Sequence, residues 1–213
     1  MKNLMMSLVV ILAALCCVAF PRGALAFGFG ADVSGGFGRL KTTDNFFFGG
    51  PDTTTSYDVT RWAAGLMYDT NVRQDKLFNY RLGISSQNMK ASSANESIDL
   101  DGVSFDNDFG FAFIRDEKMR IWAGPEVRVE FVEGEIRDAN GRSHTNNTAF
   151  GIAPVVGANL HLNKDISLCL KGGYMFLEGV RIFSEWEERY GFFSIGIMQR
   201  FGADRPPAKG GNL

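Results

Sequence analysis

The sequence predicts an all-β protein: an eight-stranded antiparallel up-and-down barrel that crosses a membrane. Three observations favour this fold. Apolar and polar residues alternate along eight segments, the apolar side of every segment is free of charge, and the connections alternate between short and long. Because the side chains of an extended strand point to opposite faces in turn, such alternation separates two surfaces with different surroundings.

The first 26 residues predict a signal peptide that is cleaved near Ala26. Lys2 precedes an apolar run over residues 4–20, and residues 24–26 form a cleavage site of the A-x-A type. A retained membrane anchor is the alternative, because seventeen mostly apolar residues nearly span a bilayer. The A-x-A-type site favours cleavage of this segment and therefore export of the protein.

Cleavage would remove Lys2 and Arg22, leaving 20 basic and 24 acidic residues and a formal charge of −4. This acidic balance argues against nucleic acid as a partner. Cys169 would be the one remaining cysteine, which excludes an intramolecular disulfide. Residues 27–201 suit a single barrel domain, and the Pro- and Gly-rich residues 202–213 predict a disordered C-terminal tail.

The eight segments have the length of transmembrane strands, since a tilted strand needs about 9–11 residues to cross the hydrocarbon region. They lie near 27–40, 57–69, 77–89, 102–114, 119–133, 148–162, 166–177 and 190–201. Short turns with the sequences DTNVRQDK, RDEK and NKD are expected at one end. Longer polar loops are expected at the other, near 41–56, 90–101, 134–147 and 178–189.

The charge-free face predicts contact with lipid. A lone charge on such a face costs about 2–4 kcal/mol near the bilayer midplane, so its absence from all eight segments is selective. The face includes Phe29, Phe37, Trp62, Tyr80, Phe111, Ile152, Tyr174 and Ile195. A soluble barrel with an apolar interior is the alternative. It would have to pack every large aromatic into a small lumen and leave a Gly-rich face in water.

The opposite face predicts the lining of a narrow, salt-bridged lumen. It carries five acids and six bases: Asp32, Arg61, Arg81, Asp106, Asp108, Arg120, Glu126, Arg128, Glu130, Lys171 and Arg200. The lumen of an eight-stranded barrel is just wide enough for side chains. Opposite charges in that space should pair, because an unpaired buried charge is very costly. A narrow channel for ions or small solutes is the alternative.

The last segment, YGFFSIGIMQRF, places Phe193, Ile195, Ile197 and Phe201 on one face. A closing strand of this pattern resembles the C-terminal assembly signal of bacterial outer-membrane β-barrel proteins. That resemblance implies recognition by the barrel-insertion machinery.

The layout of the chain, from signal to closing strand, resembles the small eight-stranded outer-membrane barrels of the OmpA, OmpX and OmpW kind. The resemblance implies insertion into a Gram-negative outer membrane with both ends periplasmic and four loops outside. It also implies outer-membrane lipid and lipopolysaccharide as partners. It includes no active-site motif, so we expect no enzyme activity, cofactor or metal, and function has to be argued from particular sites.

Aromatic residues in two expected loops predict contact with an extracellular partner. Phe46, Phe47 and Phe48 lie in the first loop, and Phe183 and Trp186 lie in the fourth. Exposed aromatics bordered by polar residues often mark contact sites, and we therefore expect a structural or adhesive surface protein. The alternative is that the strands extend beyond the membrane and pack these side chains.

Two prolines predict a local gap in the sheet. Pro125 and Pro154 lie on neighbouring segments, and proline cannot donate to a β-ladder. This resembles the outer-membrane lipid A palmitoyltransferase, whose lateral openings are associated with prolines, and implies a lipid-modifying enzyme as another alternative. His144, beside Ser143, is the candidate base of such an enzyme. A solvated loop is the better explanation of His144, and His161 is expected to be an inward residue that pairs near Ser167, beside the NKD turn.

Overall fold

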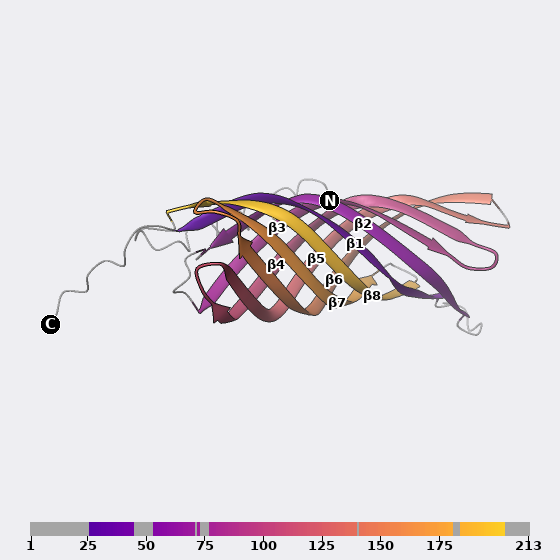
Figure 1. Ribbon diagram of the computed structural model, residues 1–213. Coiled ribbons are helices and arrows are strands. Elements are labelled where there is room, and N and C mark those ends of the chain that lie inside the picture. Colours follow the sequence, from indigo (N-terminus) through magenta and orange to yellow (C-terminus); the bar gives the residue numbers. More distant parts are fainter. Residues whose placement is uncertain are drawn as a thin grey trace, which may run out of the picture.

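The computed structural model describes residues 26–44, 53–70, 72, 77–139, 141–180 and 184–202, and within them it forms a closed barrel of eight antiparallel strands (Figure 1). The strands are β1 (Phe27–Asp44), β2 (Thr53–Thr70), β3 (Phe78–Ser92), β4 (Ser97–Arg115), β5 (Met119–Asp138), β6 (Gly141–His161), β7 (Ile166–Val180) and β8 (Ser184–Phe201). Each strand pairs with the next in sequence, and β1 pairs with β8. The predicted architecture is therefore confirmed.

The barrel closes between its first and last strands, which begin and end at the same rim. Phe27 is the cross-strand partner of both Thr70 and Phe201, and the rings of Phe27 and Phe201 stack with centroids 4.9 Å apart. We assign this rim to the periplasm because the short turns lie at it. The expected signal peptide and tail lie outside the described residues, apart from Ala26 and Gly202.

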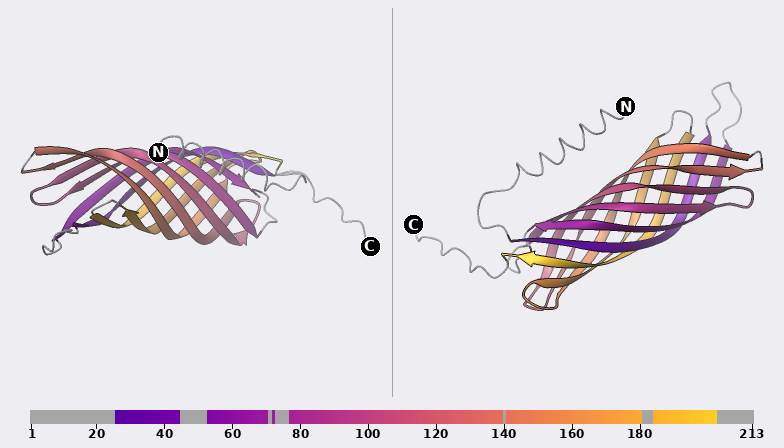
Figure 2. Two further views of the ribbon diagram at one scale, coloured as in Figure 1. Left: turned by 180° about the vertical axis from the view of Figure 1, so that it is seen from behind. Right: turned by 90° about the horizontal axis from the view of Figure 1, so that it is seen from above.

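The long polar loops expected at the opposite rim are largely strand. The ladders continue through half of 41–56 and through most of 90–101, 134–147 and 178–189, and β5 runs to Asp138 before β6 starts at Gly141. Figure 2 shows these hairpins continuing past the body of the barrel. The prediction of loops was wrong because the residues there are polar outside and apolar inside, the reverse of the pattern lower in the barrel.

A belt of apolar side chains surrounds the barrel, as the charge-free face predicts. Its exposed members include Phe29, Val33, Phe37, Trp62, Leu66, Ile84, Phe111, Val127, Phe150, Ile152, Val156, Tyr174, Phe176, Phe193, Ile195 and Ile197. Toward the hairpins it ends at the first charged outward residues of six strands: Arg39, Asp58, Asp101, Glu133, Glu178 and Arg189. We call the strand segments beyond these residues the extracellular arms.

The periplasmic turns are held by short-range hydrogen bonds. The carboxylate of Asp116 accepts hydrogen bonds from the backbone N–H groups of Met119 and Lys118, at 2.7 and 2.8 Å. These bonds, the one from Met119 first, hold the pKa of Asp116 below its ordinary value. Asn163 closes the β6–β7 turn in the same way through the N–H groups of Asp165 and Ile166. Within the described ranges, no helix is long and apolar enough to cross a bilayer.

Candidate functional site in the lumen

The inward face carries all eleven predicted lumen charges. Ten of them are buried, and Asp32 is half-buried, where its carboxylate accepts a hydrogen bond of 2.6 Å from the hydroxyl of Ser194. These side chains share the barrel interior because every second residue of each strand points inward. Sequence spacing alone places them there.

Seven ion pairs join eight of the inward residues into one group, which we call the central ionic chain. Its members are Glu188, Arg61, Glu130, Arg128, Asp106, Glu126, Lys171 and Asp108. At its extracellular end the guanidinium of Arg61 lies 2.6 Å from the Glu188 carboxylate and 2.8 Å from that of Glu130. Both carboxylates are fully buried, and Arg61 forms an ion pair with each of them.

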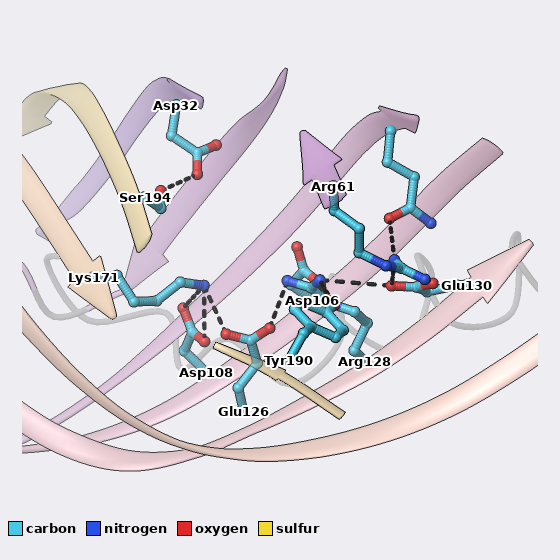
Figure 3. Close-up of polar contacts among 11 residues, drawn as sticks. Asp32, Arg61, Asp106, Asp108, Glu126, Arg128, Glu130, Lys171, Tyr190 and Ser194 are labelled. Atoms are coloured by element: carbon cyan, nitrogen blue, oxygen red, sulfur yellow. Dashed lines mark hydrogen bonds and ion pairs between the residues drawn. The ribbon is translucent and has the colours of Figure 1, made fainter. Parts of the chain in front are cut away.

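Arg128 and Lys171 form the middle of the central ionic chain. The Arg128 guanidinium lies 2.6 Å from Asp106 and 2.8 Å from Glu126, and it donates a hydrogen bond of 2.6 Å to the hydroxyl of Tyr190. The ammonium of Lys171 lies between two carboxylates, 2.8 Å from Glu126 and 3.1 Å from that of Asp108 (Figure 3). Pairs of this geometry offset the desolvation cost that isolated charges would bear.

Two inward acids were not predicted. Asp69 lies 2.8 Å from Arg81, and Glu188 lies at the extracellular end of the central ionic chain. Both are in phase with predicted charges on their own strands: Asp69 with Arg61, and Glu188 with Arg200. The shared strand face could have identified Asp69 as a lumen residue. Glu188 could not be identified in this way, because it lay in a segment predicted to be a loop. Among the described inward positions there are thus seven carboxylates and six basic side chains.

Apolar side chains close the lumen on the extracellular side of the ionic chain. This upper apolar cluster consists of Leu40, Tyr57, Val59, Met89, Ala91, Ile98, Leu100, Val132 and Trp186. Trp186 is only 2% exposed and points inward from β8, so its prediction as an exposed loop contact was wrong. Phe46, Phe47, Phe48 and Phe183 lie outside the described residues.

Trp122 closes the lumen on the periplasmic side. Its indole lies beneath the guanidinium of Arg81, 5.4 Å from the ring centroid, and is seated on two glycines of the neighbouring strands. A Cβ at Gly157 would come within 2.3 Å of the ring, and one at Gly110 within 2.8 Å. Only glycine leaves room for the indole at these two positions.

The space left inside is small. A cavity of about 20 Å³ lies beside the ionic chain, lined by Asp32, Arg81, Ser85, Asp106, Asp108, Cys169, Lys171 and Ser194 among others. That volume holds about one water molecule.

The two histidines lie at opposite ends of β6. His144 is exposed on β6, opposite Glu135, and His161 hydrogen-bonds to Ser167 at the periplasmic rim, with 2.9 Å between ring nitrogen and hydroxyl. Cys169 is buried beside Arg81. Within the described part of the chain, no group of three or more His, Cys, Asp or Glu residues is arranged to hold a metal ion.

The outward face contains the residues of the expected assembly signal and the two prolines. Phe193, Ile195, Ile197 and Phe201 are all exposed on β8. Pro125 and Pro154 are direct cross-strand partners on the outer wall. The strand ladder is interrupted on both sides of this pair. The β4–β5 pairing skips two residues on each strand beside Pro125, and the β6–β7 pairing skips two on each strand beside Pro154.

The fold, the apolar belt and the filled lumen define a small outer-membrane β-barrel, and the chain is an integral protein of the bacterial outer membrane. Its structure is similar to the outer membrane protein OprG from Pseudomonas aeruginosa (TM-score 0.54, 10% identity, covering 83% of this chain and 96% of that one). Neisserial surface protein A aligns with a TM-score of 0.44 at 13% identity, over 83% and 99% of the chains. No family model and no curated protein matches the chain. At these identities the likeness concerns the fold.

Proposed function

We propose that this protein is a surface-interaction protein whose barrel anchors a rigid set of extracellular arms. The observation that carries the proposal is the inversion of the faces above the belt. There the upper apolar cluster fills the interior, while the outward positions hold charged and hydrogen-bonding side chains. A paired β-structure with its own core presents side chains at low entropic cost, which favours recognition.

The outer surface of the β4 and β5 arms favours a basic partner. Asp99 is the direct partner of Glu135, and Asp101 of Glu133, so four carboxylates face outward on two adjacent strands. Like charges directly opposite each other across a ladder are destabilising. Asn88 donates a hydrogen bond of 3.0 Å to each of the two aspartates and offsets part of that repulsion. Lys90 lies 3.8 Å from Asp99 and Arg137 lies 3.1 Å from Glu135, so these two acids already have basic neighbours. A partner with Lys or Arg side chains would offset the repulsion between Asp101 and Glu133.

This function is tested by binding to a basic polypeptide. Purified protein in lipid nanodiscs is passed over polylysine and polyglutamate layers, and we expect salt-sensitive binding to polylysine. Asp101→Asn combined with Glu133→Gln should weaken it. The matched control, Glu117→Gln with Asp165→Asn, removes the same charge from the periplasmic turns and should bind as the wild type does. Equal binding by the two double variants would overturn the proposal.

A second candidate function is lateral access of lipid to the barrel interior. The interrupted β6–β7 ladder supports it, because the inward residues behind the interruption are apolar: Ala153, Val155, Met175 and Phe192 belong to one buried cluster. An acyl chain entering there would contact side chains of its own polarity. A lipid-modifying enzyme would additionally need a nucleophile and base within hydrogen-bond reach of each other.

Lateral access is tested with a lipid that carries a thiol-reactive group on its acyl chain. In a Cys169→Ser background, Met175→Cys should be labelled in the bilayer and Met89→Cys, inside the upper apolar cluster, should not. Equal labelling of the two would remove lateral access. Lipid A mass spectra that stay unchanged on overexpression would remove the enzymatic form of this candidate.

A further inference from the structure

Two arginines face each other on the outer wall where the barrel closes. Arg39 of β1 and Arg189 of β8 are direct cross-strand partners, and both point outward just above the apolar belt. Two like charges in this position repel each other. Their acidic neighbours compensate weakly: Arg39 lies 4.0 Å from Asp58 and Arg189 lies 3.9 Å from Glu187, between largely exposed side chains. Exposed pairs of this kind contribute little.

The wall directly below the two arginines lacks side chains at two outward positions. Gly191 is the partner of Phe37 on one side and of Tyr174 on the other, and a Cβ at Gly191 would meet no atom within 4 Å. Gly35, one step down on the adjacent strand, would meet only a backbone oxygen at 3.9 Å. Both glycines lie on the outward face, so two neighbouring positions of the wall have no side chain. Phe37 is 77% exposed and borders this depression.

We propose that this part of the wall binds a phosphorylated glycolipid of the outer leaflet, with a phosphate between Arg39 and Arg189 and an acyl chain over Gly191 and Gly35. The arginines lie at the level of the lipid headgroups because the belt ends immediately beneath them. Guanidinium groups bind phosphate through paired hydrogen bonds. The glycine depression offers an acyl chain a contact surface that a smooth wall lacks.

Charge favours a phosphate monoester over a phosphodiester. A monoester carries between one and two negative charges at neutral pH, whereas a diester carries one. Two adjacent guanidiniums neutralise the former more completely. The other charged groups that face the site are Asp58, Glu187 and Lys41, and Lys41 is the direct partner of Glu187. Lys41 can compensate Glu187 when Arg189 binds the phosphate, whereas Asp58 would share Arg39 with the phosphate.

The site is tested with full-length protein in nanodiscs by native mass spectrometry. Diphosphorylated lipid A is added to wild type and to the Arg39→Gln/Arg189→Gln variant. We expect the variant to bind about tenfold more weakly, because it loses the charge-assisted hydrogen bonds of both guanidinium groups to the phosphate. Lys90→Gln/Arg137→Gln removes the same charge from another part of the arms and should bind as the wild type does.

Two further arms of the experiment test the occupant and the depression. Dephosphorylated lipid A and phosphatidylglycerol should both bind several-fold more weakly than diphosphorylated lipid A. Gly191→Leu should reduce lipid A binding with both arginines intact, whereas Ala158→Leu, elsewhere on the belt, should not. The proposal is overturned if the arginine variant binds lipid A like wild type, if phosphatidylglycerol binds equally well, or if Gly191→Leu changes nothing.

Discussion

Pro125 of β5 and Pro154 of β6 lie directly opposite each other in the barrel wall. The carbonyl oxygen of Pro154 is directed toward Gly173 of β7, so the ring nitrogen of Pro154, on the same edge of its strand, also faces β7. The nitrogen of Pro125 correspondingly faces β4. The ladder between the two prolines therefore stays complete, and the missing donors fall on the neighbouring seams, where the pairing is interrupted.

Replacing Pro154 should repair the β6–β7 seam. Pro154→Val supplies an N–H that faces β7, and one added hydrogen bond should stabilise the barrel by about 1 kcal/mol. Hydrogen exchange of β7 amides near Met175 should slow. Pro125→Val is the matched control, because its new N–H faces β4 and should leave β7 exchange unchanged. If both variants protect β7 equally, the assignment of the seams is wrong.

Removing Arg61 should strongly destabilise the barrel. Arg61→Leu leaves the buried carboxylate of Glu188 without its cation and leaves Glu130 with only Arg128, 3.5 Å away. Breaking a buried pair costs about 3–5 kcal/mol. Urea unfolding from lipid vesicles measures this loss. Adding Glu130→Leu and Glu188→Leu to the same chain should restore most of the lost stability, because an apolar replacement has no charge to desolvate. A triple variant less stable than Arg61→Leu would contradict this account.

The wild-type barrel should be silent in planar bilayers, and Arg128→Ala should conduct. The cavity beside the central ionic chain holds about one water molecule, and ion-paired and apolar side chains fill the lumen on either side of it, so we expect no current through the intact barrel. Without the Arg128 side chain, Asp106, Glu126 and Glu130 lose a shared cation, and the enlarged space should favour cations. Single-channel recording gives the current and its selectivity. Arg142→Ala, on an extracellular arm, should stay silent, and wild-type currents or anion selectivity would refute the plug.

Much of the central ionic chain could be predicted because residue spacing decides which face a side chain joins. Arg128 and Glu130 are two apart and share a face in any strand, whatever its partners are. Partner choice could not be predicted. Arg61 meets Glu188 across 127 residues of sequence, and that contact exists only because the barrel closes and sets the register of every strand. No local pattern contains this information.

The extracellular arms were misread for a different physical reason. Side chains still alternate between the two faces there, but the environments of the faces change. The outer face meets water in place of lipid, and the interior is apolar in place of ionic. Trp186 and Leu40 therefore point inward among apolar side chains, although the same residue types point outward in the belt. An assignment that expects the same face to be apolar along the whole strand therefore ends the strand where it leaves the membrane.

The hydroxyl of Tyr57 should titrate at unusually high pH. It donates a hydrogen bond to the carboxylate of Glu96 in the β3–β4 turn, above the belt, and burial, followed by this bond, raises the pKa of Tyr57 to about 12. The protonated form is favoured in the folded state, so its stabilising effect is complete below pH 10 and is lost as the pH rises toward 12. The absorbance difference at 295 nm between wild type and Tyr57→Phe should show this midpoint. A midpoint near 10, the ordinary value, would show that the hydroxyl is solvated.

The three tryptophans should report which face of the wall meets lipid. Trp62 is 57% exposed in the belt, whereas Trp122 and Trp186 point into the lumen. Variants that keep one tryptophan and replace the others with phenylalanine are refolded into vesicles whose acyl chains carry bromine, a short-range quencher. Trp62 should lose most of its fluorescence, and Trp186 should keep it, in both brominated lipid and aqueous acrylamide. Quenching of Trp186 by brominated lipid with Trp62 unaffected would mean that the two faces are reversed, and the plugged lumen would have to be abandoned with them.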